Sequence, residues 1–170
     1  MTKALGFSLI LAAALLFAAQ RYAEGKRRAE SLDSFCLMLE HMRGILENQV
    51  PPIPELLDTL SRRCDGPARD FSMRLRQSMG SLGRVSFREL WTKALFSCKA
   101  ETDPETLREL DALGTVLGRY DLETQCASIN ECLRALRQRQ EQLKKTLPQS
   151  ARLSFGIALC AAFLLGILLF

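Results

Sequence analysis

The sequence has one histidine, few aromatic residues and no Cys-x-x-Cys pair in its 170 residues. One histidine cannot form a metal cluster, and no glycine-rich loop is followed by Lys-Ser or Lys-Thr. The carboxylates are spread among basic residues, which is typical of solvated helix faces rather than of paired acid–base catalysts. We therefore expect no enzyme activity, no catalytic residue, no metal or other cofactor, and no small-molecule substrate.

A strong excess of charge of one sign is also missing. The formal net charge is only +4, and the aromatic residues, 7% of the chain, are not interleaved with basic ones. Nucleic-acid binding, by phosphate attraction or by base stacking, is therefore not expected. The six cysteines mostly fall on apolar helix positions, which predicts buried thiols and a reducing compartment, with disulfides or a metal site as the alternatives.

Both ends of the chain lack charge. Apart from Lys3, every Lys, Arg, Asp and Glu lies between residues 20 and 152. As a helix, the 18 uncharged residues 153–170 rise roughly 27 Å, close to the ~30 Å hydrocarbon core of a bilayer. The first apolar run is shorter, and a signal peptide or a buried soluble helix are its alternatives. Flanking cations favour a marginal span, so we predict transmembrane helices at 4–20 and 153–170.

The basic residues next to these runs predict the orientation. They lie on the inner flank of each run, at Arg21, Lys26, Arg27, Arg28, Lys144, Lys145 and Arg152. By the positive-inside rule, residues 21–147 are cytoplasmic and both termini lie on the other side of the cell membrane.

The middle segment lacks the alternating β-branched pattern of strands. Apolar residues instead recur at helical spacing, first from Leu32 to Leu46, and prolines at residues 51, 52 and 54 end that pattern. A second stripe runs from Leu122 to Leu147 in steps of four and three, which indicates a helix packed against a helical partner, and Pro148 is expected to interrupt it. We predict an all-α fold, with a cytoplasmic bundle of five to six helices over 21–147 flanked by the two transmembrane helices.

Residues 113–125, here called the corner, hold the most specific local pattern. Gly114 would let a neighbouring helix backbone approach, Gly118 would end one helix in left-handed geometry, and Asp121 would cap the next. A tight helical hairpin explains these residues, and a docking surface for a partner is the functional alternative. The docking candidates are Gly114, Gly118, Arg119, Asp121, Glu123 and Gln125.

The chain resembles the stage III sporulation protein AB family of spore-forming bacteria nearly from end to end. The resemblance rests on Lys3-Ala4-Leu5-Gly6, Leu90-Trp91-x-x-Ala94-Leu95, Leu113-Gly114-x-x-Leu117-Gly118-x-x-Asp121-x-x-x-Gln125, Gly156 and Gly166-Ile167-Leu168-Leu169. Each motif alone is weak, but their order and spacing are specific. The six cysteines are not among the features on which the resemblance rests.

This resemblance implies a role in the secretion-like channel between mother cell and forespore, in the mother-cell membrane around the forespore. The family is similar to the F-type platform proteins of type II secretion and type IV pilus machines. The implied partners are the cytoplasmic ATPase of the complex, stage III sporulation protein AA, and the other stage III A membrane subunits. A platform or scaffold subunit that couples this ATPase to the membrane assembly is the expected function.

Two other classes of function compete with this expectation. A membrane-anchored helical sensor or regulatory adaptor would relay signals between the two spans, but residues 1–3 and Phe170 offer no ligand domain outside the membrane. An enzyme with an unrecognised site is disfavoured because the sequence lacks catalytic motifs.

Overall fold

The structure, a computed structural model, describes residues 2–169, with the side chains of residues 12, 13, 15–144 and 156. The helices are α1 (Thr2–Asn48), α2 (Ile53–Arg63), α3 (Gly66–Ser78), a short 3-10 helix η1 (Met79–Ser81), α4 (Phe87–Phe96), α5 (Pro104–Leu113) and α6 (Leu122–Leu169). Over residues 2–169 there is no strand, only an isolated bridge between Leu82 and Val85. The predicted all-α class is confirmed.

The chain divides into two compact units. Residues 27–141 form the larger unit, called the bundle below, and residues 1–26 with 142–170 form the smaller one. Among the residues that the structure describes, no helix is both long and apolar enough to cross a membrane. Residues 4–11 and 14 of the first predicted span, and all of the second except Gly156, lie outside the described side chains.

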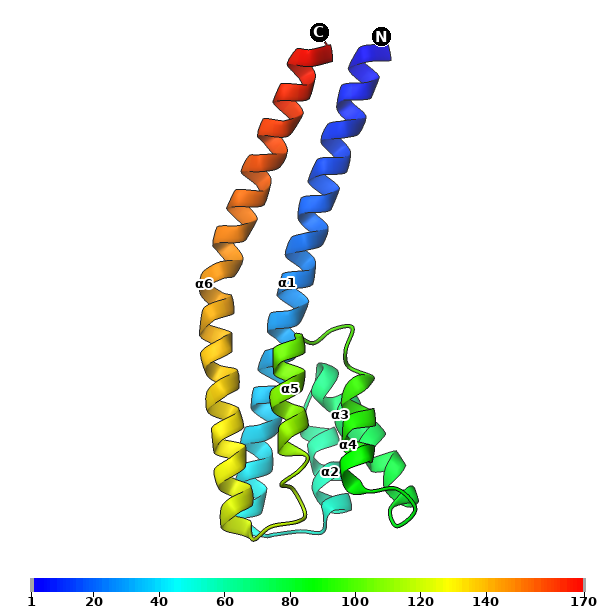
Figure 1. Ribbon diagram of the computed structural model, residues 1–170, viewed down its shortest axis with the longest axis vertical. Helices are drawn as coiled ribbons and strands as arrows, with labels where there is room; N and C mark the ends of the chain where they lie inside the picture. The colour runs from blue at the N-terminus through cyan, green and yellow to red at the C-terminus, as the bar shows by residue number, and fades with distance from the viewer. Residues whose placement is uncertain (1, 170) are drawn as a thin grey trace. The chain divides into compact units, whose positions relative to one another are not determined.

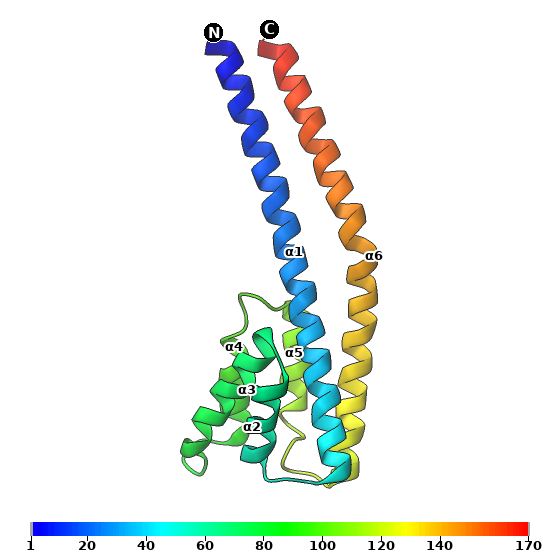
Figure 2. The ribbon, with the colours of Figure 1, turned by 180° about the vertical axis from the view of Figure 1, so that it is seen from behind.

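In the bundle, the end of α1 and the start of α6 run side by side in opposite directions (Figures 1 and 2). Three polar pairs join them, from Glu40 to Arg137 (2.6 Å), from Arg43 to Asn130 (2.8 Å) and from Asp33 to Gln140. Between these pairs the predicted stripes are buried, at Leu32, Phe35, Cys36, Leu39, Met42 and Leu46 on α1 and at Ile129, Leu133 and Leu136 on α6. The predicted helical partner of the last stripe is therefore α1.

Helices α2 to α5 complete the core. An aromatic row crosses it, because Phe71 lies 6.1 Å from Phe35 and 4.8 Å from Trp91 between ring centroids, both edge to face. Each of these three side chains is almost fully buried. Edge-to-face pairs add to the free energy of burial, so the row ties α1, α3 and α4 together.

Side-chain caps mark the starts of two helices. The Ser86 hydroxyl accepts a hydrogen bond from the Glu89 amide at 3.3 Å, and the Asp103 carboxylate accepts one from the Thr106 amide at 3.3 Å. Each bond satisfies a backbone donor that the first helical turn leaves unpaired. These caps fix where α4 and α5 begin.

Two predicted boundaries are wrong. Pro148 lies inside α6 rather than ending it. A proline removes one backbone hydrogen bond and strains its own turn, but the helix continues on both sides. Gly118 does not directly end α5, which stops at Leu113 and passes into turns over 114–119. Leu113 and Leu117 keep a helix-like spacing and are both buried, although the residues between them form turns.

Candidate functional site

The side chain of Trp91 packs against the start of the corner. The indole nitrogen donates a hydrogen bond to the Leu110 carbonyl at 2.8 Å, which holds the ring against the end of α5. A Cβ on Gly114 would stand 2.3 Å from indole Cδ1, far inside contact distance. The absence of a side chain at Gly114 therefore makes room for Trp91, and not for a helix backbone as the sequence had suggested.

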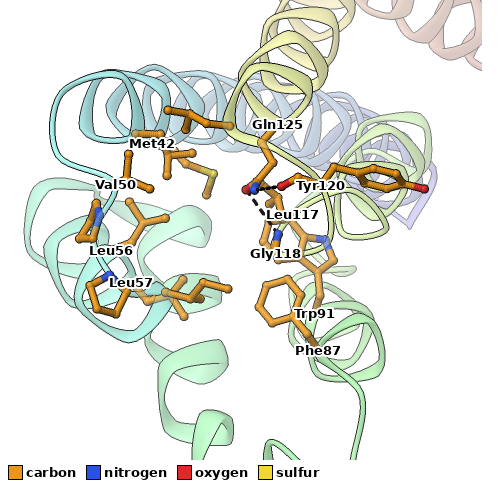
Figure 3. Close-up of a pocket in the computed structure, with 15 residues that line it drawn as sticks. Met42, Val50, Leu56, Leu57, Phe87, Trp91, Leu117, Gly118, Tyr120 and Gln125 are labelled. Atoms are coloured by element: carbon orange, nitrogen blue, oxygen red, sulfur yellow. Dashed lines mark hydrogen bonds between the residues drawn. The ribbon is translucent and has the colours of Figure 1, made fainter.

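Gln125 holds the turn that follows. Its side-chain oxygen accepts a hydrogen bond from the Gly118 amide at 3.3 Å, and its side-chain nitrogen donates one to the Tyr120 carbonyl at 2.6 Å (Figure 3). Gly118 has a φ of +74°, the left-handed conformation that the sequence predicted, which side chains rarely adopt. One amide side chain on α6 thus fixes a turn of unusual backbone geometry.

Asp121 caps α6 as predicted. Its carboxylate accepts hydrogen bonds from the Thr124 amide at 3.0 Å and the Thr124 hydroxyl at 2.8 Å. The hydroxyl bond first, and the amide bond second, lower the pKa of this exposed carboxyl from its ordinary value, because both favour the ionised form. The negative charge of Asp121 is therefore firmly held at the first turn of α6.

Next to the corner lies an apolar pocket of about 360 Å³, called the corner pocket below (Figure 3). Its walls come from the end of α1, the proline linker, α2, α4 and the corner. They comprise Met42, Leu46, Val50, Pro51, Pro52, Ile53, Leu56, Leu57, Phe87, Trp91, Leu117, Gly118, Tyr120, Leu122 and Gln125. The volume suits a bulky apolar side chain or a small ligand.

The six docking candidates divide between these features. Gly118 and Gln125 line the corner pocket, while Gly114 is buried beneath Trp91. Arg119, Asp121 and Glu123 are exposed beside the pocket-lining residues. The structure therefore brings the candidates to one region. Three of them have structural roles there, because Gly114 makes room for Trp91, Asp121 caps α6 and Gln125 holds the turn.

The sequence did not indicate the opposite wall of the corner pocket. The sequence indicates only a helix stop at Pro51 and Pro52. In the structure these prolines line the pocket together with Val50. Val50 has a φ of +39° and is 58% exposed. A β-branched residue in this backbone region is strained, and such strain gathers at functional sites. The available signal was an apolar residue, Val50, next to two prolines.

No metal-binding arrangement occurs in the described part of the chain, where no three His, Cys, Asp or Glu side chains gather closely enough. The Gly118 amide, the Tyr120 carbonyl and the Gln125 side chain are hydrogen-bonded to one another. The arrangement supports binding by shape and apolar contact.

The comparisons with known proteins agree with this architecture. A solved structure described as stage III sporulation protein AB superposes with a TM-score of 0.63 over 72% of this chain and 97% of that one, at 14% identity. This likeness concerns the fold. No curated protein matches the chain. The family model for stage III sporulation protein AB matches residues 3–170, and the chain belongs to that family.

Proposed function

We propose that this chain is a non-enzymatic, membrane-anchored platform subunit of the secretion-like sporulation complex between mother cell and forespore. It couples the cytoplasmic ATPase, stage III sporulation protein AA, to the other stage III A subunits in the membrane. Family membership supports the sporulation context. The arrangement of the two long helices supports the proposed coupling role.

The observation that carries the proposal is the continuity of α1 and α6. α1 spans Thr2–Asn48 and α6 spans Leu122–Leu169, so each contains one apolar end of the chain and one side of the bundle. A continuous helix is stiffer than a flexible linker. A force on the bundle is therefore passed along the helix backbones to the apolar segments.

Membrane anchoring has support from the described part of the first apolar run. Leu16 is 70% exposed and Phe17 is 62% exposed, and both lie in one turn of α1. Adjoining exposed apolar side chains mark a surface that lipid or protein covers. We place both apolar segments in the mother-cell membrane around the forespore, with residues 21–147 cytoplasmic, because the basic residues flank them on that side.

The corner is the proposed contact for the ATPase. Arg119 and Glu123 are exposed there and form no ion pair with another described residue. Exchanging their charges should change the surface that a partner meets while leaving the core intact.

The test uses sporulating cells that lack the chain and receive the full-length Arg119→Glu/Glu123→Lys variant. We expect spore formation to fail and the ATPase to stop copurifying, with the melting temperature within a degree or two of the wild type, since such surface changes usually cost under ~0.5 kcal/mol. The matched control exchanges the exposed charges of Glu101 and Arg108, outside the corner. Normal spore formation without the chain would refute the proposed function itself.

A further inference from the structure

The charges around the corner pocket are unequal. Glu47, Glu55, Asp121 and Glu123 are exposed carboxylates next in sequence to pocket-lining residues, and Arg43, Arg88 and Arg119 are the basic residues in such positions. Arg43 pairs with Glu47 at 3.5 Å, and Arg88 pairs with Asp111 at 2.5 Å. Within the described residues this leaves three carboxylates without an ion pair, at Glu55, Asp121 and Glu123, against Arg119 alone.

We call Glu55, Asp121 and Glu123 the acidic rim. Its negative charge contrasts with the chain as a whole, whose formal net charge is +4. The carboxylates come from separate elements, with Glu55 on the first turn of α2 and Glu123 on the first turn of α6. The excess of negative charge beside the pocket-lining residues therefore does not come from one helix alone.

Apolar surface continues from the walls of the corner pocket to its mouth. Val50 is 58% exposed and Tyr120 is 57% exposed, and Figure 3 shows them on opposite sides of the pocket. The amide of Gly118 and the carbonyl of Tyr120 are already bonded to Gln125. The walls therefore offer apolar contact and few free hydrogen-bonding groups, which disfavours a small polar ligand.

We propose that the corner pocket receives one bulky apolar side chain from a basic amphipathic segment of a partner protein, whose cations meet the carboxylates at the rim. The proposal rests on the scaffold role above and specifies the chemistry of the partner. An anchor side chain in an apolar pocket, surrounded by complementary charges, is a recurrent design of protein recognition. The corner of a second copy of this chain would fit the pocket less well, because the acidic rims of the two copies would repel each other.

Trp91 supplies the readout, since it is the only tryptophan in the chain and it lines the pocket. The probes are two synthetic amphipathic helical peptides without tryptophan that share one apolar face with a p-iodophenylalanine anchor. One carries lysines on its polar face and the other carries glutamates. The iodine quenches indole fluorescence only near contact, so quenching reports occupation of the pocket.

With the full-length chain in nanodiscs of zwitterionic lipid, we expect the lysine peptide to quench Trp91 saturably and the glutamate peptide not to. The Glu55→Lys/Glu123→Lys variant should weaken the lysine peptide by about tenfold, since each reversal replaces a screened attraction by a repulsion. The matched control is Glu101→Lys/Glu131→Lys, which makes the same change in net charge at exposed carboxylates that adjoin no pocket-lining residue. This control should bind like the wild type.

Equal quenching by both peptides would overturn the role of the rim, and no quenching by either would overturn the pocket as an anchor site. Concentration-dependent self-association that blocks the lysine peptide would assign the surface to a second copy instead. Each failure is separable from failure of the scaffold role, because spore formation in cells that carry or lack the chain is scored independently of peptide binding.

Discussion

The indole ring of Trp91 fills the space that a side chain at Gly114 would need. A Cβ there would stand 2.3 Å from Cδ1 and 2.6 Å from Cγ of the ring, and the ring is also tied to the Leu110 carbonyl. The ring has little freedom to move, because it also packs on Phe71 with 4.8 Å between the ring centroids. The fit joins α4 to the corner.

Gly114→Ala should therefore destabilise the protein by about 1–3 kcal/mol through overpacking, measured as a loss of thermal stability and a change in Trp91 fluorescence. Gly44→Ala is the matched control, since nothing lies within 4 Å of its added Cβ and the residue is inside α1. That control should gain about 0.5–1 kcal/mol from the better helix former. Equal stability of the two variants would contradict the close contact.

Gly118→Val should cost about 1–3 kcal/mol, because a β-branched residue is poorly tolerated at a φ of +74°. Gly118→Asn should cost much less, since asparagine accepts left-handed geometry. Both variants place a Cβ 3.1 Å from Ile53 Cδ1, so the crowding caused by the Cβ itself is common to both. Denaturant unfolding of the two variants measures the difference in stability, and equal midpoints would show that crowding dominates.

The sequence predicted the fold well because its signals are local. Apolar spacing, the Asp121 cap and the proline stop after α1 each depend on a few neighbouring residues, and the structure confirms each of them. The same locality failed at Pro148. The predicted break considered only the effect of the proline on its own helical turn, whereas α6 continues on both sides of Pro148.

The candidate site was only half predictable for the same reason. The left-handed Gly118 and the cap at Asp121 could be inferred from adjacent residues. The contact between Trp91 and Gly114 joins residues far apart in sequence, and the corner pocket combines a wall at Val50 with a wall at Tyr120. Such pairings depend on how the helices pack, which spacing within one helix does not specify.

The cap at Asp121 should give the protein a pH-dependent stability. Its pKa is lowered in the folded state, so its contribution is fully present above the ordinary pKa of aspartate and is lost as the pH falls through the lowered value. The melting temperature of the wild type relative to Asp121→Asn should therefore decline on acidification, because asparagine keeps an acceptor but does not titrate. Thr124→Val, which removes the larger cause of the shift, should reduce this decline. A pH-independent difference would contradict the lowered pKa.

Cys132 should be chemically inert in the folded protein. Burial, and to a lesser extent the nearby Glu109, raises the pKa of its thiol to about 12, and the side chain is 5% exposed. Since the thiolate is the reactive form, iodoacetamide at pH 8 should leave Cys132 unmodified in the native chain.

Cys126 is the internal control, because its pKa is also raised but the residue is only partly buried on the same helix. Mass spectrometry should find Cys126 alkylated first and both cysteines alkylated after unfolding. Equal native rates would mean that α1 and α6 separate readily, and the buried stripe between them would then be too weak to pass a force along the helices.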